Sequence, residues 1–256
     1  MDNLYYVLLT NLVIVFSLIC ITVLVTVHLV KKRKFNLFSY LILSICVVGM
    51  YLYVPSRYVH LGFVNQNPQM LKKAIKFSIN PYEKRLCNLF LADIYAKPIY
   101  EIGLKDGNKA IYYMEKALNG EYKKYSGVTR HLAYLYSIKG DYQKTEELNN
   151  ILGDKQSLSL RNIYILNNEY KKAVMTFSQD NISVENYLKA SLYKKLGNTK
   201  LAIQAEKIAI KTYNYQLENI KETSKKQEYR ESVNKYRTIE AYKSWLKQEA
   251  RNYKFI

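Results

Sequence analysis

Hydrophobic positions are concentrated near the start of the chain, in two long runs from Leu4 to Val30 and from Phe35 to Val54. The runs are separated only by four cations, Lys31, Lys32, Arg33 and Lys34. Each run can cross the hydrocarbon core of a bilayer as a helix, because about 20 helical residues rise about 30 Å. Four adjacent cations cannot lie in lipid, so we expect a tight turn at one membrane face. Residues 1–57 are therefore predicted to form a two-helix transmembrane hairpin with spans at about 4–30 and 35–54.

The basic turn also predicts which way the hairpin faces. Short loops rich in Lys and Arg remain on the cytoplasmic side, whereas Asp and Glu have little influence. Residues 1–3 carry no Lys or Arg, and only Arg57 follows the second run closely, although Lys72, Lys73 and Lys76 lie further along. We expect the turn to face the cytoplasm, which places the rest of the chain on the extracytoplasmic side.

A pattern of small, apolar and turn positions recurs between residues 69 and 212. Its anchors, Ala110, Thr145, Ala173 and Ala202, are spaced 35, 28 and 29 residues apart. The other recurring positions are small residues, tyrosines and turn glycines: Ala92, Ala133, Ala190, Tyr95, Tyr136, Tyr164, Tyr193, Gly140 and Gly197. Small residues let two antiparallel helices approach closely, tyrosines fill the space between successive pairs, and glycine suits the left-handed residue that ends a helix. Because no pair can bury its apolar face alone, residues 58–212 are predicted to stack as helix pairs in an α-solenoid.

These residues resemble the tetratricopeptide repeat family. One matching copy contains Tyr187, Ala190, Leu192, Tyr193, Leu196, Gly197, Ala202, Ala205 and Ala209, and a second contains Leu132, Ala133, Tyr136, Gly140, Asp141 and Tyr142. The earliest copy is also similar to Sel1-like repeats, through Ile94, Tyr95, Gly103, Leu104, Asp106, Lys109, Ala110, Tyr113, Lys116 and Ala117. Spacings of 28 and 29 residues fall short of the family's usual 34, and Thr145 stands at a position that is otherwise Ala. The resemblance implies a protein-binding scaffold without catalysis.

The last segment, residues 213–256, contains no Gly or Pro and is densely charged. Its apolar residues recur at spacings of three and four, at Tyr229, Val233, Tyr236, Ile239, Tyr242, Trp245 and Leu246. This spacing predicts a charged amphipathic helix that caps the end of the solenoid. The alternative is a helix that reaches the membrane or a partner through Trp245 and the cations Lys243, Lys247, Arg251 and Lys254.

Candidate catalytic chemistry is sparse. The chain has three histidines and three cysteines, and no His, Cys, Asp or Glu group has the spacing of a metal site. Neither a phosphate-binding glycine loop nor a nucleophile elbow is present. Cys87 is the only thiol beyond the two apolar runs, so a disulfide within the soluble domain is excluded. We expect no enzyme, no cofactor and no metal.

We therefore predict an all-α, membrane-anchored scaffold for an unidentified protein partner, at a bacterial inner or plasma membrane. The concave face of the solenoid would supply its contacts, with candidates at Asn88, Arg130, Tyr134, Asn162 and Lys189. The net charge of +18 supports an alternative, a charge-driven module that binds anionic lipid or an envelope polymer. A membrane protein of the toxin-immunity type is a further alternative, and nucleic acid is not an expected ligand.

Overall fold

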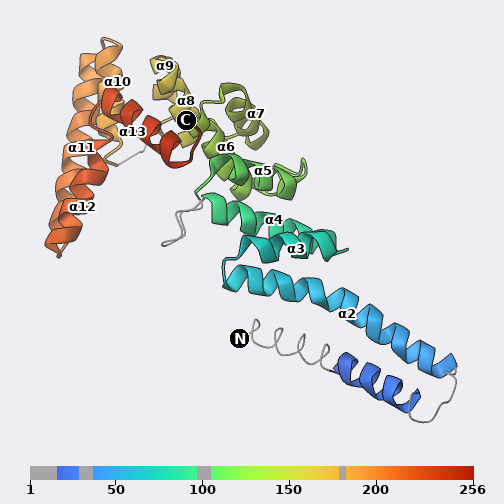
Figure 1. Ribbon diagram of the computed structural model, residues 1–256. Coiled ribbons are helices and arrows are strands. Elements are labelled where there is room, and N and C mark those ends of the chain that lie inside the picture. The colour runs from blue at the N-terminus through green and yellow to red at the C-terminus, as the bar shows by residue number, and fades with distance from the viewer. Residues whose placement is uncertain (1–15, 29–36, 97–104, 179–182) are drawn as a thin grey trace. The chain divides into compact units, whose positions relative to one another are not determined.

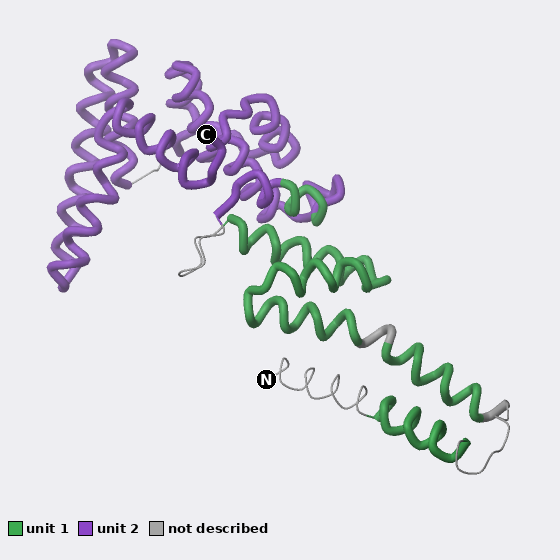
Figure 2. Tube along the Cα trace, viewed as in Figure 1, with its two compact units in different colours: residues 1–104, 112–117 green, residues 105–111, 118–256 purple. Residues whose placement is uncertain are grey.

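The computed structural model describes residues 16–28, 37–96, 105–178 and 183–256 (Figure 1). Within these ranges the chain forms helices joined by turns and contains no strand, which confirms the predicted all-α class for this part. The predicted basic turn, Lys31, Lys32, Arg33 and Lys34, lies outside the described residues. The chain divides into two compact units, residues 1–104 with 112–117 and residues 105–111 with 118–256 (Figure 2). Each unit is described by itself.

The first unit contains an apolar helix, Phe16–His28, followed by α2 (Leu37–Val64), α3 (Pro68–Phe77) and α4 (Pro81–Ala96). Within α2, the stretch Ser39–Val64 has a mean hydropathy of 1.6. Among the described residues it is the one stretch both long and apolar enough to cross a membrane. Phe16–His28 is apolar but shorter.

Helix α2 does not end where the apolar run ends. It continues through Pro55 to Val64, so the predicted boundary at residue 57 falls inside a helix. A proline inside a helix removes one backbone hydrogen bond. Packing of the later turns offsets this cost: Gly62 lies so close to Leu71 of α3 that a Cβ there would be 2.7 Å from Leu71 Cγ. The Phe63 and Phe90 rings also lie 4.3 Å apart, which joins α2 to α4.

The second unit is built mainly from successive helices that pack in pairs. They are α6 (Ser126–Lys139), α7 (Tyr142–Leu152), α8 (Leu158–Leu166), α9 (Tyr170–Met175), α10 (Asn186–Lys195) and α11 (Thr199–Asn219). Within this group α6 packs on α7, α8 on α9 and α10 on α11, while α7 contacts α8 and α9 contacts α10. Helix α5 (Gly107–Leu118) is divided between the two units.

The predicted packing residues other than the two glycines lie within helices α4 to α11. The seven small residues, Ala92, Ala110, Ala133, Thr145, Ala173, Ala190 and Ala202, are buried, and so are Tyr95 and Tyr136. Tyr164 and Tyr193 are half-buried. Gly140 and Gly197 follow α6 and α10 with φ of 83° and 77°, in the left-handed region that favours glycine.

The C-terminal segment differs from its prediction as one helix. It contains the end of α11, then α12 (Thr223–Asn234) and α13 (Ile239–Asn252). Two local interactions accompany these breaks. The Tyr213 and Tyr229 rings stack 5.7 Å apart and hold α12 beside α11. Thr238 begins α13 by accepting a hydrogen bond from the Ala241 N–H at 3.0 Å, as an N-cap residue does.

Candidate functional site

Helix α13 packs against α6, α8 and α10, the first helix of each pair in the second unit (Figure 1). We call the side of these three helices that meets α13 the inner face. The α13 residues that are buried, Ile239, Tyr242, Leu246 and Ala250, follow one another at spacings of three and four. They therefore form one stripe of the helix, the arrangement by which an amphipathic helix is taken up by an apolar surface. The C-terminal segment thus covers the inner face instead of closing only the last pair.

A buried chain of hydrogen bonds lies at the centre of the inner face. The Tyr242 hydroxyl donates to Asn162 Oδ1 at 2.7 Å, and Asn162 Nδ2 donates to Ser137 Oγ at 2.9 Å. Ser137 in turn donates to the Tyr134 carbonyl at 2.7 Å. Burial raises the pKa of Tyr242, so the phenol stays neutral and keeps its proton for this bond. The chain fixes α13 against α8 and α6 by polar groups that are all satisfied.

The position of Asn162 corrects the prediction that it is an exposed partner contact. Its side chain is fully buried, with Tyr242 on one side and Ser137 on the other. We expected an exposed position because the C-terminal segment was predicted to lie at the end of the solenoid. The interaction between residues 162 and 242 has no signal in the local pattern.

Both ends of α13 are fastened as well. At its start, the Ile239 N–H donates to Ser191 Oγ of α10 at 3.2 Å. After its end, the Gly107 N–H donates to the Tyr253 carbonyl at 2.7 Å. Lys105 lies 4.0 Å from the centre of the Tyr253 ring, in cation–π geometry. Contacts along its whole length therefore hold α13 on the inner face.

An ion pair between a buried arginine and a half-buried glutamate lies beside this site. Arg161 of α8 is 5% exposed, and its Nη1 lies 2.7 Å from Glu185 Oε2. Its Nε donates to Thr176 Oγ1 at 3.2 Å, and its guanidinium lies 3.7 Å from the centre of the Phe177 ring. Lys189 of α10 is half-buried at 5.9 Å from the same ring, and burial together with Arg161 lowers the pKa of Lys189. The cluster is held by charge pairing and ring contacts, which position helices and do not activate a nucleophile.

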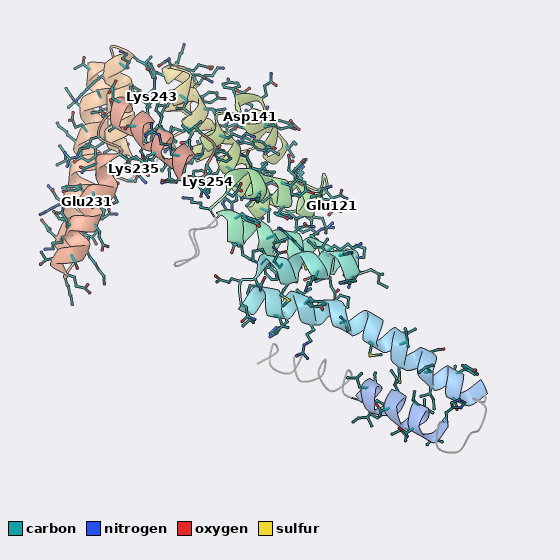
Figure 3. The ribbon with its side chains drawn as sticks, viewed as in Figure 1. Glu121, Asp141, Glu231, Lys235, Lys243 and Lys254 are labelled. Carbon is teal, nitrogen blue, oxygen red and sulfur yellow. The ribbon has the colours of Figure 1, made fainter. Side chains whose placement is uncertain are left out.

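Lys235, labelled in Figure 3, lies beside Trp245, the single tryptophan of the chain. The Lys235 ammonium lies 4.3 Å from the centre of the Trp245 ring and 5.1 Å from that of Tyr236. Burial lowers the pKa of Lys235, although Glu249 and Glu185 act in the opposite direction. Burial also raises the pKa of Tyr236 to about 12. The Tyr236 phenol therefore stays neutral at neutral pH.

The other predicted partner contacts lie in different surroundings. Arg130 is exposed, and its Nε lies 3.4 Å from Asp154 Oδ2. Tyr134 is half-buried, and burial raises the pKa of its phenol. Asn88 belongs to the first unit, where its Nδ2 donates to the Lys84 carbonyl at 2.9 Å. The structure therefore does not gather the five predicted contacts into one exposed surface.

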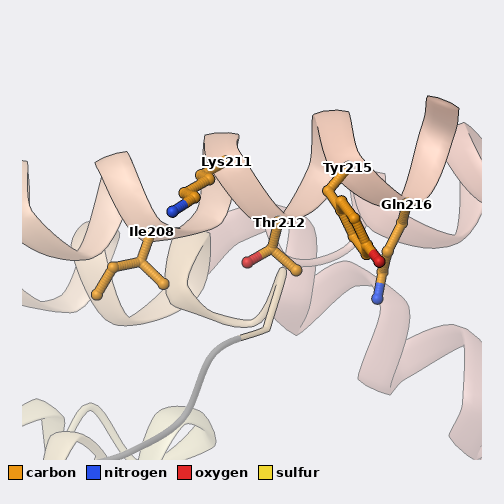
Figure 4. Close-up of a pocket in the computed structure, with 5 residues that line it drawn as sticks. All are labelled: Ile208, Lys211, Thr212, Tyr215 and Gln216. Carbon is orange, nitrogen blue, oxygen red and sulfur yellow. The ribbon is translucent and has the colours of Figure 1, made fainter.

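A cavity of about 550 Å³ lies along α11, away from the residues chosen by sequence reasoning (Figure 4). It is lined by Ile208, Lys211, Thr212, Tyr215 and Gln216. Tyr215 is 68% exposed, and Ile208 is exposed as well. The sequence does show the large apolar residues Ile208 and Tyr215, but we assigned their segments to solenoid packing and to the cap.

Within the described ranges, no three His, Cys, Asp or Glu side chains are grouped so that they could hold a metal ion. No protein-family model, characterised protein or solved structure matches the chain.

Proposed function

We propose that the protein is a non-enzymatic, membrane-anchored interaction scaffold, with a two-helix hairpin as anchor and a tetratricopeptide-like α-solenoid as binding domain. The observation that carries the proposal is the inner face itself. Three successive helix pairs present α6, α8 and α10 together, and this surface takes up an amphipathic helix through a fully buried tyrosine. Surfaces that bind helices in grooves are interaction surfaces and need no catalytic group.

The anchor is supported by contacts between small residues of the two apolar helices. Ser17 and Cys20 of Phe16–His28 lie beside Cys46 of α2, and Ser17 Oγ would be 3.9 Å from a Cβ on Gly49. Ser17 and Cys46 are both buried, while their apolar neighbours are exposed. Small residues at such contacts let membrane helices approach closely, and exposed apolar residues suit lipid. We propose that these helices form a hairpin whose basic turn faces the cytoplasm of a bacterial cell.

Partner contact must use surface that α13 leaves open. Two exposed regions of the second unit meet this condition, namely the start of α6 at Arg130 and the α11 cavity at Tyr215. A photoreactive amino acid placed at either position in the full chain, in cells, should give a discrete adduct with a partner protein. A probe at Gln248, an exposed position on α13, is the matched control. If every position gives adducts only with lipid or with the chain itself, the scaffold proposal is wrong.

Salt separates this proposal from charge-driven binding. Adducts formed through an apolar cavity should survive an increase in ionic strength that shortens the Debye length to a few ångströms. Binding to a polyanion or lipid surface through lysines alone should be lost under the same condition. Loss of all adducts at high salt would therefore favour the charge-driven alternative.

The side of the membrane is tested with an introduced thiol. Lys155 is exposed between α7 and α8, whereas Cys87 is fully buried, and burial with nearby Glu83 raises the pKa of Cys87 to about 12. Lys155→Cys should therefore react with an impermeant maleimide in intact cells, while the wild-type chain gives the background. Reaction only after the cells are broken would place the domain in the cytoplasm.

A further inference from the structure

The level of the membrane surface can be traced along α2. The apolar run ends at Val54, and the helix continues without interruption to Val64. Tyr58 is one helical turn beyond Val54, which is about 6 Å along the axis. The interfacial region on each side of a bilayer is about 5–7 Å deep, since the hydrocarbon core takes about 30 Å of a total of about 40–45 Å. Tyr58 is therefore at headgroup level if α2 spans the membrane.

Helices α3 and α4 bring a second segment to the same level. The Phe77 ring at the end of α3 lies 6.4 Å from the Tyr58 ring. The Ser56 hydroxyl donates a hydrogen bond to Glu83 in the first turn of α4. Because α3 packs on α2 and ends at Tyr58, it runs back toward the apolar run. The turn between α3 and α4 thus lies level with residues 56–58.

This turn exposes three large apolar side chains. Phe77 is 43% exposed, Ile79 61% and Tyr82 69%. The exposure does not come from a loose loop, because the turn is closed by its own hydrogen bonds. Ser78 Oγ donates to Glu83 Oε2 at 2.7 Å, and the Tyr82 N–H donates to Asn80 Oδ1 at 2.9 Å. The turn presents these apolar groups in fixed positions.

Two lysines of α3 flank the aromatic rings of this region. Lys73 Nζ lies 5.9 Å from the centre of the Tyr58 ring, and Lys76 Nζ lies 5.8 Å from that of Phe77. Both lysines are exposed. We call Lys73, Lys76, Phe77, Ile79 and Tyr82 the juxtamembrane patch. Aromatic rings beside cations suit the membrane interface, where rings sit among headgroups and ammonium groups meet phosphates.

We propose that the juxtamembrane patch binds the lipid surface, with Phe77, Ile79 and Tyr82 inserted among the headgroups and Lys73 and Lys76 contacting lipid phosphates. The inference rests on the proposed membrane anchoring through α2. It gives the protein a second attachment to the membrane besides α2, so α3 and the start of α4 are held at the membrane surface. The continuous α2 helix and its packing against α3 and α4 fix the distance at which the patch meets the lipid.

The test measures depth directly, in the full chain in nanodiscs that contain anionic phospholipid. Cys20→Ala and Cys46→Ala remove the span thiols, and buried Cys87 is retained. A single fluorophore is then attached at Ile79→Cys, at Gln69→Cys or at Ile45→Cys. Gln69 is exposed at the opposite end of α3, about 12 Å from Phe77 along the helix, and is the matched control. Ile45 is exposed within α2 and reports on the span. Circular dichroism confirms that each labelled chain retains its helices.

Lipids with a nitroxide on the headgroup should quench the Ile79 probe at least threefold more strongly than the Gln69 probe. Lysine variants Lys73→Gln and Lys76→Gln together should reduce that difference in anionic nanodiscs. Equal quenching at Ile79 and Gln69 overturns the proposal, and an unchanged difference in the lysine variants overturns its phosphate contact. Nitroxides in the acyl chains should quench the Ile45 probe. If they do, failure at Ile79 concerns the patch alone, whereas failure at Ile45 removes the membrane anchor itself.

Discussion

The Tyr242 hydroxyl donates a hydrogen bond to Asn162 Oδ1 across 2.7 Å, joining two fully buried residues that are 80 positions apart in the chain. The bond ties α13 to α8 at the middle of the inner face. It is a fully buried side-chain hydrogen bond, and Leu246 and Ile239 are buried on either side of it. A buried amide oxygen without a hydrogen-bond donor costs free energy, so this bond specifies the position of α13 along the inner face.

Substitution Tyr242→Phe should lower the free energy of unfolding by about 1–3 kcal/mol, because Asn162 Oδ1 loses its buried donor. The ring volume is retained, so loss of packing contributes little. The measurement is urea unfolding of the full chain in detergent, followed by the fluorescence of Trp245, whose ring lies 5.2 Å from that of Tyr242. Tyr215→Phe removes a phenol of the same kind from an exposed position and should leave the midpoint unchanged. Equal midpoints for the two variants would show that the buried bond has no energetic role.

Alkaline pH should weaken the second unit through its buried phenols. Burial raises the pKa of Tyr236 from about 10 to about 12, and raises that of Tyr242 as well. The folded state therefore holds these protons more tightly than the unfolded state. The contribution of Tyr236 to stability is complete below pH 10 and is lost as the pH rises from about 10 to about 12. Tyr236→Phe should reduce the steepness of this loss, measured as unfolding midpoints between pH 8 and pH 11. A variant with the wild-type slope would contradict the role given to Tyr236.

The local sequence pattern predicts the helices and the small packing positions, but it does not predict the inner face. The residues around Gly140 and around Gly197 predict a helix that ends at each glycine. Both glycines adopt the left-handed conformation. The helical stripe that ends at Leu246 was also visible in the sequence. The pattern does not identify the surface on which that stripe packs, because any apolar groove could accept it.

The position at which α2 ends has a related explanation. The boundary was placed at residue 57 because the apolar run ends at Val54. The later turns of α2 are stabilised instead by Leu71 and Phe90, which belong to helices that follow it. Tertiary packing of this kind overrides local propensity.

Substitution Glu185→Ala should destabilise the second unit by about 3 kcal/mol, because it leaves the buried Arg161 guanidinium without its counter-charge. Glu185 precedes α10 but makes no side-chain capping bond, so loss of a cap does not enter. The comparison is Glu147→Ala, which removes the carboxylate from an exposed pair with Lys144 at 2.8 Å. That change should cost less than about 1 kcal/mol. Unfolding midpoints that fall equally for both variants would argue against the buried pair.

Two glycines in different backbone conformations should respond oppositely to alanine. Gly197 has a φ of 77°, and nothing lies within 4 Å of a Cβ there, so its cost is one of backbone conformation alone. Gly197→Ala should destabilise by about 1 kcal/mol. Gly127 is helical in α6 and equally open, so Gly127→Ala should stabilise by about 0.5 kcal/mol. Thermal unfolding of the two variants side by side measures the difference, and changes of the same sign would contradict the assigned helix end.

Oxidation of the native cysteines tests the hairpin. The Cys20 and Cys46 thiols lie beside each other, on Phe16–His28 and α2. Copper–phenanthroline in isolated membranes should therefore join them within one chain, seen by mass spectrometry as a linked peptide pair that reduction separates. Cys46→Ser should abolish the product, and Cys87 should take no part because it is fully buried in the soluble region. Cross-linked dimers in place of the internal bridge would mean that the two apolar helices meet between chains, and the single-chain hairpin would have to be abandoned.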